Sequence, residues 1–387
     1  MIRTVLILLL TVLSVRAEKL LVITEPTARG YLGTLLQEWA AQVQSEGRYT
    51  TVEIREAQRY VQLPGSSASR WASIAVVSNL IARHNPDAVQ FVGALPFYLG
   101  GGFNEDGHFT RCAVTDAPYM ATNVTFTDTI SWGMDNSTYL ASNEPGDGRF
   151  DNLNATGFAR PVARISAAVI ENSASNVFGS GCLIGLYQTP AVNEAVALMA
   201  YFTNNLAYRR GLWTTAATGY ITGPLFTSAN TYITTNASQL TWATSLGAIG
   251  GGSRPRMMYQ SWDNSEINNL YDGSCVPIRA LMMFIYRSYM FEVYDMQGYA
   301  NGMERLLYPG RTTEPYALVA GWTHGNTAST FWVSRPADTH VADVITTSAA
   351  QYGSLNLFYW LAGDVSLPVD GQTTNFPMSR ITTLQTR

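Results

Sequence analysis

The chain has three cysteines and four histidines that could supply thiol chemistry. Cys275 follows a polar Asp-Gly-Ser turn and precedes a helix-prone run, and a thiol at a helix N-terminus has a lowered pKa. His324 lies between an apolar run and a polar Gly-Asn-Thr turn, a place where an α/β sheet presents site residues. These positions predict Cys275 as a nucleophile and His324 as its base. The alternatives are a disulfide-bonded or buried thiol and a turn histidine.

The other two cysteines are Cys112 and Cys182, so the chain has an odd number of cysteines. In an oxidising compartment at least one thiol is therefore free or pairs between chains. No two cysteines have the Cys-x-x-Cys spacing, which disfavours a cysteine-ligated zinc site.

A second group of side chains could hold a metal ion through oxygen. Glu144, Asp147, Asp151 and Asn152 lie close together on a glycine-containing stretch, and Asp116 precedes the same long loop. Carboxylate and amide oxygens on such a loop suit calcium, although the spacing lacks a full EF-hand. The sequence therefore predicts a structural calcium site here, with a plain Asp/Gly turn as the alternative.

The elements that position these residues alternate between strand and helix. Apolar runs and helical spacing predict strands at 19–24, 50–56 and 88–93, with helices at 33–44 and 71–84 between them. This order predicts a mostly parallel sheet flanked by helices on both faces. The later predicted strands are 161–167, 211–220, 245–250, 256–262, 316–323 and 355–362; the later helices are 189–209 and 340–352, and 278–294 is a helix or a helix–strand pair.

The stretch from 99 to 156 has a different texture, rich in Gly, Asn and Asp. A loop of this length is functional or contains a small structure of its own. The length of 387 residues allows one large α/β domain over 18–387, or two α/β subdomains that meet near 165–190.

The first 17 residues have the features of a signal peptide. Arg3 is the positive residue, Val5 to Leu13 is a short apolar run, and Ala17 ends a cleavage-like segment. The run is too short to span a membrane, and no later segment is long and apolar enough, which disfavours an integral membrane protein. The expected location is extracellular or periplasmic; a buried N-terminal strand is the alternative.

Charge excludes one class of partner. Cleavage after Ala17 removes two arginines and leaves 22 basic against 28 acidic residues, a net charge of −6. Nucleic-acid binding needs a basic face, and the arginines are scattered along the chain with no basic patch. The charge therefore disfavours nucleic acid as a partner. The oligomeric state is left open.

Four sequons could accept N-linked glycans, at Asn123, Asn136, Asn154 and Asn236. They would be modified only in a eukaryotic secretory pathway. Chance explains them about as well in a chain this rich in Asn, Ser and Thr.

Six segments follow one another in a recognisable order. They are KLLVIT (19–24), HNPDAVQFVGALP (84–96), TDAPY (115–119), PGDGRFD (145–151), PVARISA (161–167) and LAGDVSLP (361–368). In this order they resemble the gingipain-like cysteine peptidase family. The match covers roughly residues 19–225, and the last segment looks like the family's closing Gly-Asp-Pro-Thr-Leu segment.

The resemblance implies a caspase-like α/β fold and a secreted protein. It also implies a His-Gly turn that supplies the general base and a cysteine nucleophile after the next strand, with backbone N–H groups holding the oxyanion. The chain departs from this pattern. AIGGGS (248–253) has glycines where the histidine belongs, and the following strand at 256–262 has no cysteine.

A second layout uses His324 and Gly325 as the His-Gly turn, but the next apolar strand, 355–364, also lacks a cysteine. The sequence therefore predicts a family member whose catalytic pair is absent or rearranged, with weak or no cysteine endopeptidase activity; if active, it would act on peptides or proteins. A non-catalytic surface or binding protein on the same scaffold is the alternative. A carbohydrate-binding or hydrolytic protein would need two carboxyl groups about 5–10 Å apart in a cleft, and nothing in the sequence selects it.

Overall fold

The computed structural model describes a set of separate ranges. They are 17–60, 67–103, 109–127, 129, 132–133, 142–143, 152–166, 170–171, 186–187, 191–212, 216–222, 240–243, 255–261, 282–286, 319–323, 342 and 361–368. The predicted signal peptide, apart from Ala17, lies outside these residues.

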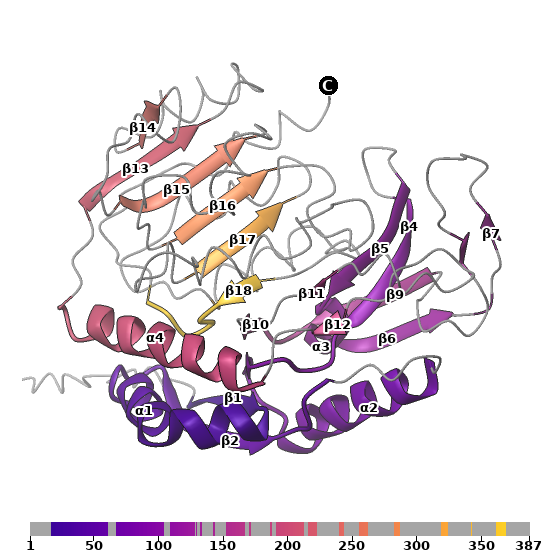
Figure 1. Cartoon of the computed structure of the whole chain (residues 1–387), viewed down its shortest axis with the longest axis horizontal. Coiled ribbons are helices and arrows are strands. Elements are labelled where there is room, and N and C mark those ends of the chain that lie inside the picture. The colour runs from indigo at the N-terminus through magenta and orange to yellow at the C-terminus, as the bar shows by residue number, and fades with distance from the viewer. Residues whose placement is uncertain are drawn as a thin grey trace, which may run out of the picture.

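A ten-stranded sheet connects the described parts of the chain (Figure 1). In spatial order, one half contains β2 (Tyr49–Glu56), β1 (Glu18–Thr24), β3 (Ala88–Val92), β10 (Val162–Ile165) and β18 (Leu361–Gly363). The other half continues with β17 (Val319–Thr323), β16 (Met282–Tyr286), β15 (Pro255–Ser261), β13 (Ala216–Thr222) and β14 (Leu240–Ala243).

The strands are parallel within each half and antiparallel where the halves meet. The pairs β1–β2, β1–β3, β3–β10 and β10–β18 are parallel, as are β16–β17, β15–β16, β13–β15 and β13–β14. Among the neighbouring strands described in this sheet, only β17 and β18 run in opposite directions. The carboxyl ends of the strands in the two halves therefore lie at opposite edges of the sheet. This confirms the prediction of an α/β fold with a mostly parallel sheet.

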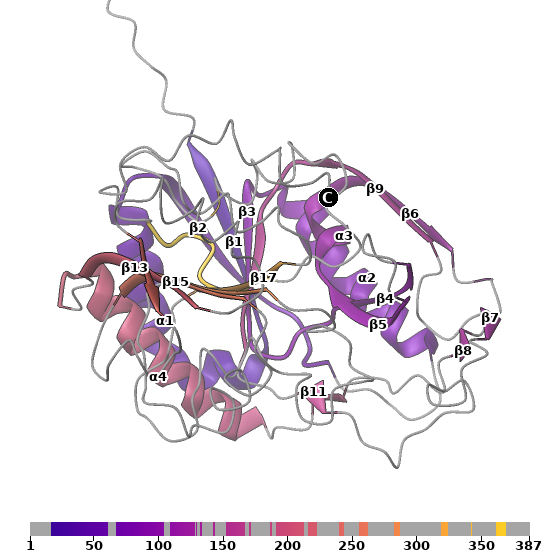
Figure 2. The same cartoon turned by 90° about the horizontal axis from the view of Figure 1, so that it is seen from above.

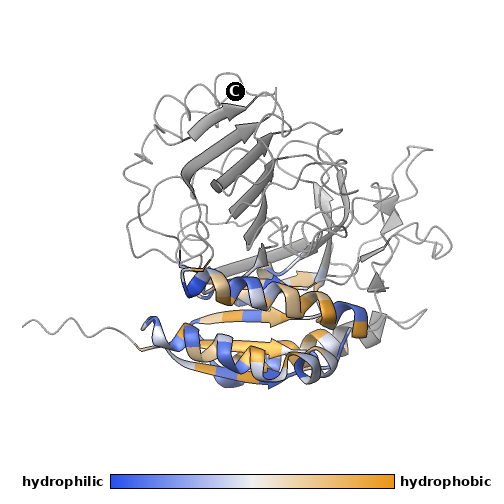
Figure 3. Ribbon diagram, turned by 60° about the vertical axis from the view of Figure 1, so that its left-hand side comes forward, coloured by the Kyte–Doolittle hydropathy of each residue, from blue (hydrophilic) through white to orange (hydrophobic). Residues whose placement is uncertain are grey.

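Burial explains why the first half forms as it does. Leu20, Leu21, Val22 and Ile23 of β1 are fully buried, and all five residues of β3 are buried as well. Such runs suit strands covered on both faces, as parallel sheets require. The edge strand β2 instead has exposed and half-buried residues after its first position. Figure 3 shows the hydrophobic colour concentrated on the strands that lie between the helices.

Helices cover both sides of this half. Figure 2 shows α1 (Pro26–Ser45) and α4 (Ala191–Arg209) on one side of the strands, with α2 (Ser67–His84) and the short α3 (Ala117–Met120) on the other. The order β1-α1-β2-α2-β3, with β1 in the middle, needs crossovers in opposite directions. Right-handed crossovers then place α1 and α2 on opposite faces.

Helix α1 begins earlier than its spacing predicts. The apolar pattern predicts a start at Gly33, whereas α1 begins at Pro26 and is interrupted at Gly33, where φ is +42°. Glycine adopts this backbone conformation without the strain that a Cβ would add. The buried stripe of α1 contains Leu32, Leu36, Trp39 and Val43, as the spacing predicts.

Small two-stranded ribbons occupy much of the region from 99 to 156, which confirms that it contains structure of its own. They pair β4 (Tyr98–Phe103) with β5 (Phe109–Thr115), β6 (Ala121–Thr127) with β9 (Asn152–Phe158), and β7 (Trp132–Gly133) with β8 (Ser142–Asn143). A further ribbon pairs β11 (Ile170–Glu171) with β12 (Leu186–Tyr187).

The later elements agree only in part with the predictions. The described part of the ambiguous 278–294 segment is β16, a strand, because its five residues pair with β15 and β17 on either side. The strand predicted at 211–220 begins later, at Ala216. The strand predicted at 245–250 lies outside the described residues, and so does the helix at 340–352 except for Ala342. The division into subdomains near 165–190 stays a prediction.

The segment from Leu361 to Pro368 returns late in the chain to the first half. Ala362 pairs with Arg164 of β10 and with Ala320 of β17. The Gln90 side chain of β3 fixes the segment further, since its amide donates to the Gly363 carbonyl (3.0 Å) and its oxygen accepts from the Val365 N–H (2.8 Å). The segment is thus the seam between the two halves of the sheet.

Asp364 connects this seam to both helices on that face. Its Oδ2 accepts hydrogen bonds from Trp39 Nε1 (3.0 Å), Asn205 Nδ2 (2.9 Å) and Arg209 Nη2 (2.7 Å). Its Oδ1 accepts from the backbone N–H (2.8 Å) and hydroxyl (2.6 Å) of Ser366. The Asp364 carboxylate is fully buried.

Helix length and polarity bear on membrane insertion. None of the helices in the described ranges combines the length and the apolar character needed to cross a membrane.

Candidate functional site

The predicted thiol–imidazole pair involves two residues outside the described ranges. His324 directly follows Thr323, the last residue of β17, and Cys275 precedes Met282, the first residue of β16. The backbone of Cys112 lies in β5, in a ribbon separate from the main sheet. Cys182 also lies outside the described residues.

Chain order gives the strands that flank the pair. Cys275 belongs to the connection between β15 and β16, and His324 directly follows β17. Strands β16 and β17 are parallel neighbours. The thiol–imidazole pair itself stays a prediction.

The described residues instead bring a polar cluster to the carboxyl edge of the first half. Glu25 follows β1, Arg59 lies beyond β2, Ser166 follows β10, and Glu194 lies in the first turn of α4. We call these four residues the carboxyl-edge cluster. In open α/β sheets this edge is where ligands bind, so the cluster is the described region most suitably placed for a site.

Glu25 caps helix α1. Its Oε1 accepts from the Ala28 N–H (2.6 Å) and its Oε2 from the Thr27 N–H (2.9 Å), with Pro26 at the first helical position. The side chain is only 1% exposed. Two otherwise unsatisfied N–H groups of the helix and its dipole stabilise the carboxylate in this position.

Glu194 connects the other members of the cluster. Its Oε1 accepts from the Ser166 hydroxyl (2.8 Å) and its Oε2 from Arg59 Nη1. The same Nη1 lies 3.9 Å from Oε1 of Glu25, so one guanidinium lies within ion-pair distance of two buried carboxyl groups. Arg59 keeps 15% of its side chain exposed, which makes it the most accessible of the three charged members.

Gly93 allows this cluster to approach the sheet. It has a φ of +86°, and a Cβ at this position would lie 2.7 Å from Cγ of Glu25. Its N–H donates to the Ile165 carbonyl (2.8 Å), which holds the end of β3 against the end of β10. A side chain at Gly93 would therefore displace the capping residue of α1.

The carboxyl-edge cluster contains no thiol and no imidazole, so its chemistry is electrostatic. The carboxylate oxygens accept hydrogen bonds from the helix, from Ser166 and from Arg59. The arrangement fixes the N-termini of α1 and α4 against the strand ends. Sequence analysis missed it, although an acidic residue before a proline at the end of a buried strand is a recognisable helix-start signal.

Asp116, predicted as a calcium ligand, has a different partner. Its Oδ2 accepts from Nε of Arg164 (2.5 Å) and its Oδ1 from Nη2 (2.6 Å). Arg164 also donates to the carbonyls of Leu95 and Pro96, at 2.9 and 2.6 Å. Burial raises the pKa of Asp116, while the adjacent guanidinium lowers it, and burial has the larger effect. In this structure the carboxyl group is therefore half of a buried ion pair.

The other predicted calcium ligands have no described side chains. Glu144, Asp147 and Asp151 lie outside the described residues, and Asn152 is described only as the first backbone position of β9. Within the described ranges, no group of three or more His, Cys, Asp or Glu side chains is arranged to hold a metal ion. The calcium site stays a prediction for the loop that precedes β9.

Three comparisons with known proteins were negative. No family model, no curated protein and no solved structure matches this chain.

Proposed function

We propose that this chain is a secreted relative of the gingipain-like peptidases that keeps an α/β scaffold and has weak or no cysteine endopeptidase activity. The scaffold part of this proposal is supported by the alternating elements and the mostly parallel sheet. The caspase-like character, the secretion and the family membership rest on the quoted sequence segments.

One observation carries the proposed loss of thiol catalysis. If His324 is the base after β17, a nucleophile is expected after a strand that runs parallel to β17 in the same half. β16 ends at Tyr286 and is followed by Arg287 and Ser288, and β15 ends at Ser261 and is followed by Trp262. The residues after β13 and β14 are Gly223 and Thr244. A cysteine follows none of these four strand ends, although a thiolate is what this chemistry requires.

The experiment compares hydrolysis of fluorogenic peptides by the secreted chain with hydrolysis by three variants, under reducing conditions. Cys275→Ser removes the predicted nucleophile, His324→Ala removes the predicted base, and Cys182→Ser is the matched control. We expect all four proteins to release fluorophore at the rate of protein-free buffer. A rate that Cys275→Ser and His324→Ala abolish and Cys182→Ser preserves would overturn the proposal in favour of a rearranged catalytic pair.

Secretion is tested separately. We expect the chain expressed with its own leader to appear in the medium with Glu18 as its first residue, which N-terminal sequencing determines. Retention of residues 1–17 in the folded protein would instead favour a buried N-terminal strand.

A further inference from the structure

Two of the four sequons lie opposite each other in one ribbon. In the antiparallel pairing of β6 with β9, Asn123 is the partner of Thr156, Val124 of Ala155, and Thr125 of Asn154. The sequon Asn123-Val124-Thr125 is thus in exact register with the sequon Asn154-Ala155-Thr156. Directly paired residues lie on the same face of a ribbon, so the asparagine and threonine positions of both sequons share one face.

The opposite face of this ribbon is the one that contacts the body of the protein. The Phe126 ring packs edge-on against Tyr98, with 6.2 Å between ring centroids, and Tyr98 is buried. Successive residues of a strand point to opposite faces, so Asn123 and Thr125 point away from the Tyr98 side. Both are exposed. Figures 1 and 2 both show β6 and β9 side by side and apart from the main sheet.

We propose that Asn123 is an N-glycosylation site, with the β6–β9 ribbon presenting the glycan to solvent. The proposal rests on the proposed secretion, because the modification occurs in a eukaryotic secretory pathway. The donor is an oligosaccharide linked to a lipid diphosphate. The amide nitrogen of Asn123 forms a bond to C1 of the first sugar and loses a proton, while the bond between C1 and the diphosphate oxygen breaks and the lipid diphosphate leaves.

The fold accommodates this modification without a change at its core. A glycan is bulky and hydrophilic, so its attachment point must be on the surface of the folded protein. Asn123 meets this requirement, and the hydroxyl of Thr125, two residues later, completes the acceptor sequence. The bond from Asn123 would direct the sugar away from Tyr98 and Phe126, so the aromatic contact that holds the ribbon is preserved.

The test is peptide mapping of the chain secreted from eukaryotic cells. A foreign signal sequence in place of residues 1–17 directs the chain into the pathway, so the result does not depend on the predicted leader. Release of the glycan by an amidase in heavy-oxygen water converts a modified asparagine to labelled aspartate. We expect this label at Asn123, and we expect Thr125→Ala to abolish it while Thr125→Ser retains it.

Thr127→Ala is the matched control, because Thr127 lies on the same strand and face but outside the sequon. We expect it to leave the occupancy of Asn123 unchanged. An unmodified Asn123 in secreted, folded protein would overturn the proposal. That result would not contradict the proposed secretion, because secretion is tested independently with the chain's own leader. It would also leave the proposal on peptidase activity unchanged.

Discussion

Two buried aspartate–arginine pairs hold different parts of this molecule, and the pKa values of their carboxyl groups are shifted in opposite directions. Asp116 with Arg164 fixes the chain after β3, and Asp364 with Arg209 joins the seam to α1 and α4. All four side chains are at most 1% exposed. Burial raises the pKa of Asp116 despite its arginine, whereas the pKa of Asp364 lies below its usual range.

The number of donors explains the difference. Burial opposes ionisation of Asp364 as well, but Arg209, Ser366 and Trp39 together outweigh it. Among the side chains that the structure describes, Arg164 is the donor to the Asp116 carboxyl group. A buried carboxylate is therefore stabilised as an anion by a set of donors more than by one oppositely charged neighbour. The pair with one partner should be the more easily disrupted of the two.

The largest expected effect is that of Arg164→Met. It removes the guanidinium beside Asp116 and leaves the carbonyls of Leu95 and Pro96 without that donor. We expect it to lower the free energy of unfolding by about 3–5 kcal/mol at pH 7, the range for breaking a buried ion pair. Urea denaturation of the purified chain measures this loss.

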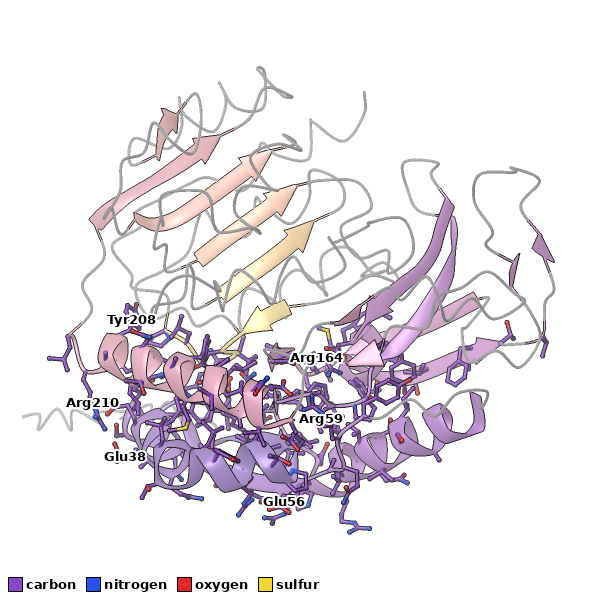
Figure 4. All side chains as sticks on the ribbon, viewed as in Figure 1. Glu38, Glu56, Arg59, Arg164, Tyr208 and Arg210 are labelled. Carbon is purple, nitrogen blue, oxygen red and sulfur yellow. The ribbon has the colours of Figure 1, made fainter. Side chains whose placement is uncertain are left out.

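Two variants serve as comparisons for Arg164→Met. Arg209→Met should lower the free energy of unfolding by less, because Asp364 keeps its hydrogen bonds from Trp39, Asn205 and Ser366. Arg210→Met removes an exposed pair with Glu38 and should cost about 0–1 kcal/mol (Figure 4). A larger loss for Arg209→Met than for Arg164→Met would contradict the argument from donor number.

A smaller effect is expected for Trp39→Phe. The change removes the indole N–H that donates to Asp364 and keeps an aromatic ring against Phe202. A hydrogen bond to a charged group contributes about 1.5–3 kcal/mol, and we expect a loss within that range. In a double-mutant cycle with Asp364→Asn, measured by urea denaturation, the two changes should be non-additive. Additive losses would show that the indole N–H does not support the carboxylate.

The smallest effect is a difference in pH dependence between Asp364→Asn and Asp116→Asn. The pKa of Asp364 is lowered by folding, so its contribution to stability is present above its unfolded pKa of about 3.9 and is lost as the pH falls through the folded value. The pKa of Asp116 is raised, so its contribution is present below about 3.9 and is lost as the pH rises through the folded value.

The stability of the native chain minus that of each variant should therefore change with pH in opposite directions. The difference for Asp364→Asn should grow from pH 3 to pH 7, and the difference for Asp116→Asn should shrink. Each unit of pKa difference corresponds to about 1.4 kcal/mol. Denaturation midpoints across this pH range give both slopes, and slopes of the same sign would refute the assignment.

The sequence predicts the first half of the sheet well because its signals are local. Leu20 to Ile23 and the residues of β3 are continuous apolar runs, and α1 and α4 have apolar residues at helical spacing. The strand β16 was ambiguous, because a short apolar run fits a buried helix and a buried strand equally well. The pairing of β16 with β15 and β17 decides between them.

The buried polar contacts were not predictable in the same way. Trp39 and Asp364 are 325 residues apart in the chain, and no local pattern indicates that an indole and a carboxylate will meet. Asp116 looked like a metal ligand because it precedes an acidic loop. Its position against Arg164 depends on β10 entering the sheet beside β3, which spacing does not reveal.

The seam at β18 has a consequence for biosynthesis. β10 pairs with β3 on one side and with β18 on the other, and β18 is the last described strand of the sheet in chain order. While the chain is being synthesised, β10 has no partner on that side until residues 361–363 have emerged. Its Val162, Ala163 and Ile165 are fully buried in the finished fold, and an uncovered apolar edge strand invites pairing with other chains. A chain that stops before this seam would thus have its N-terminal helices and strands but an unpaired edge at β10. Such a truncated product would be prone to aggregation and a substrate for cellular quality control.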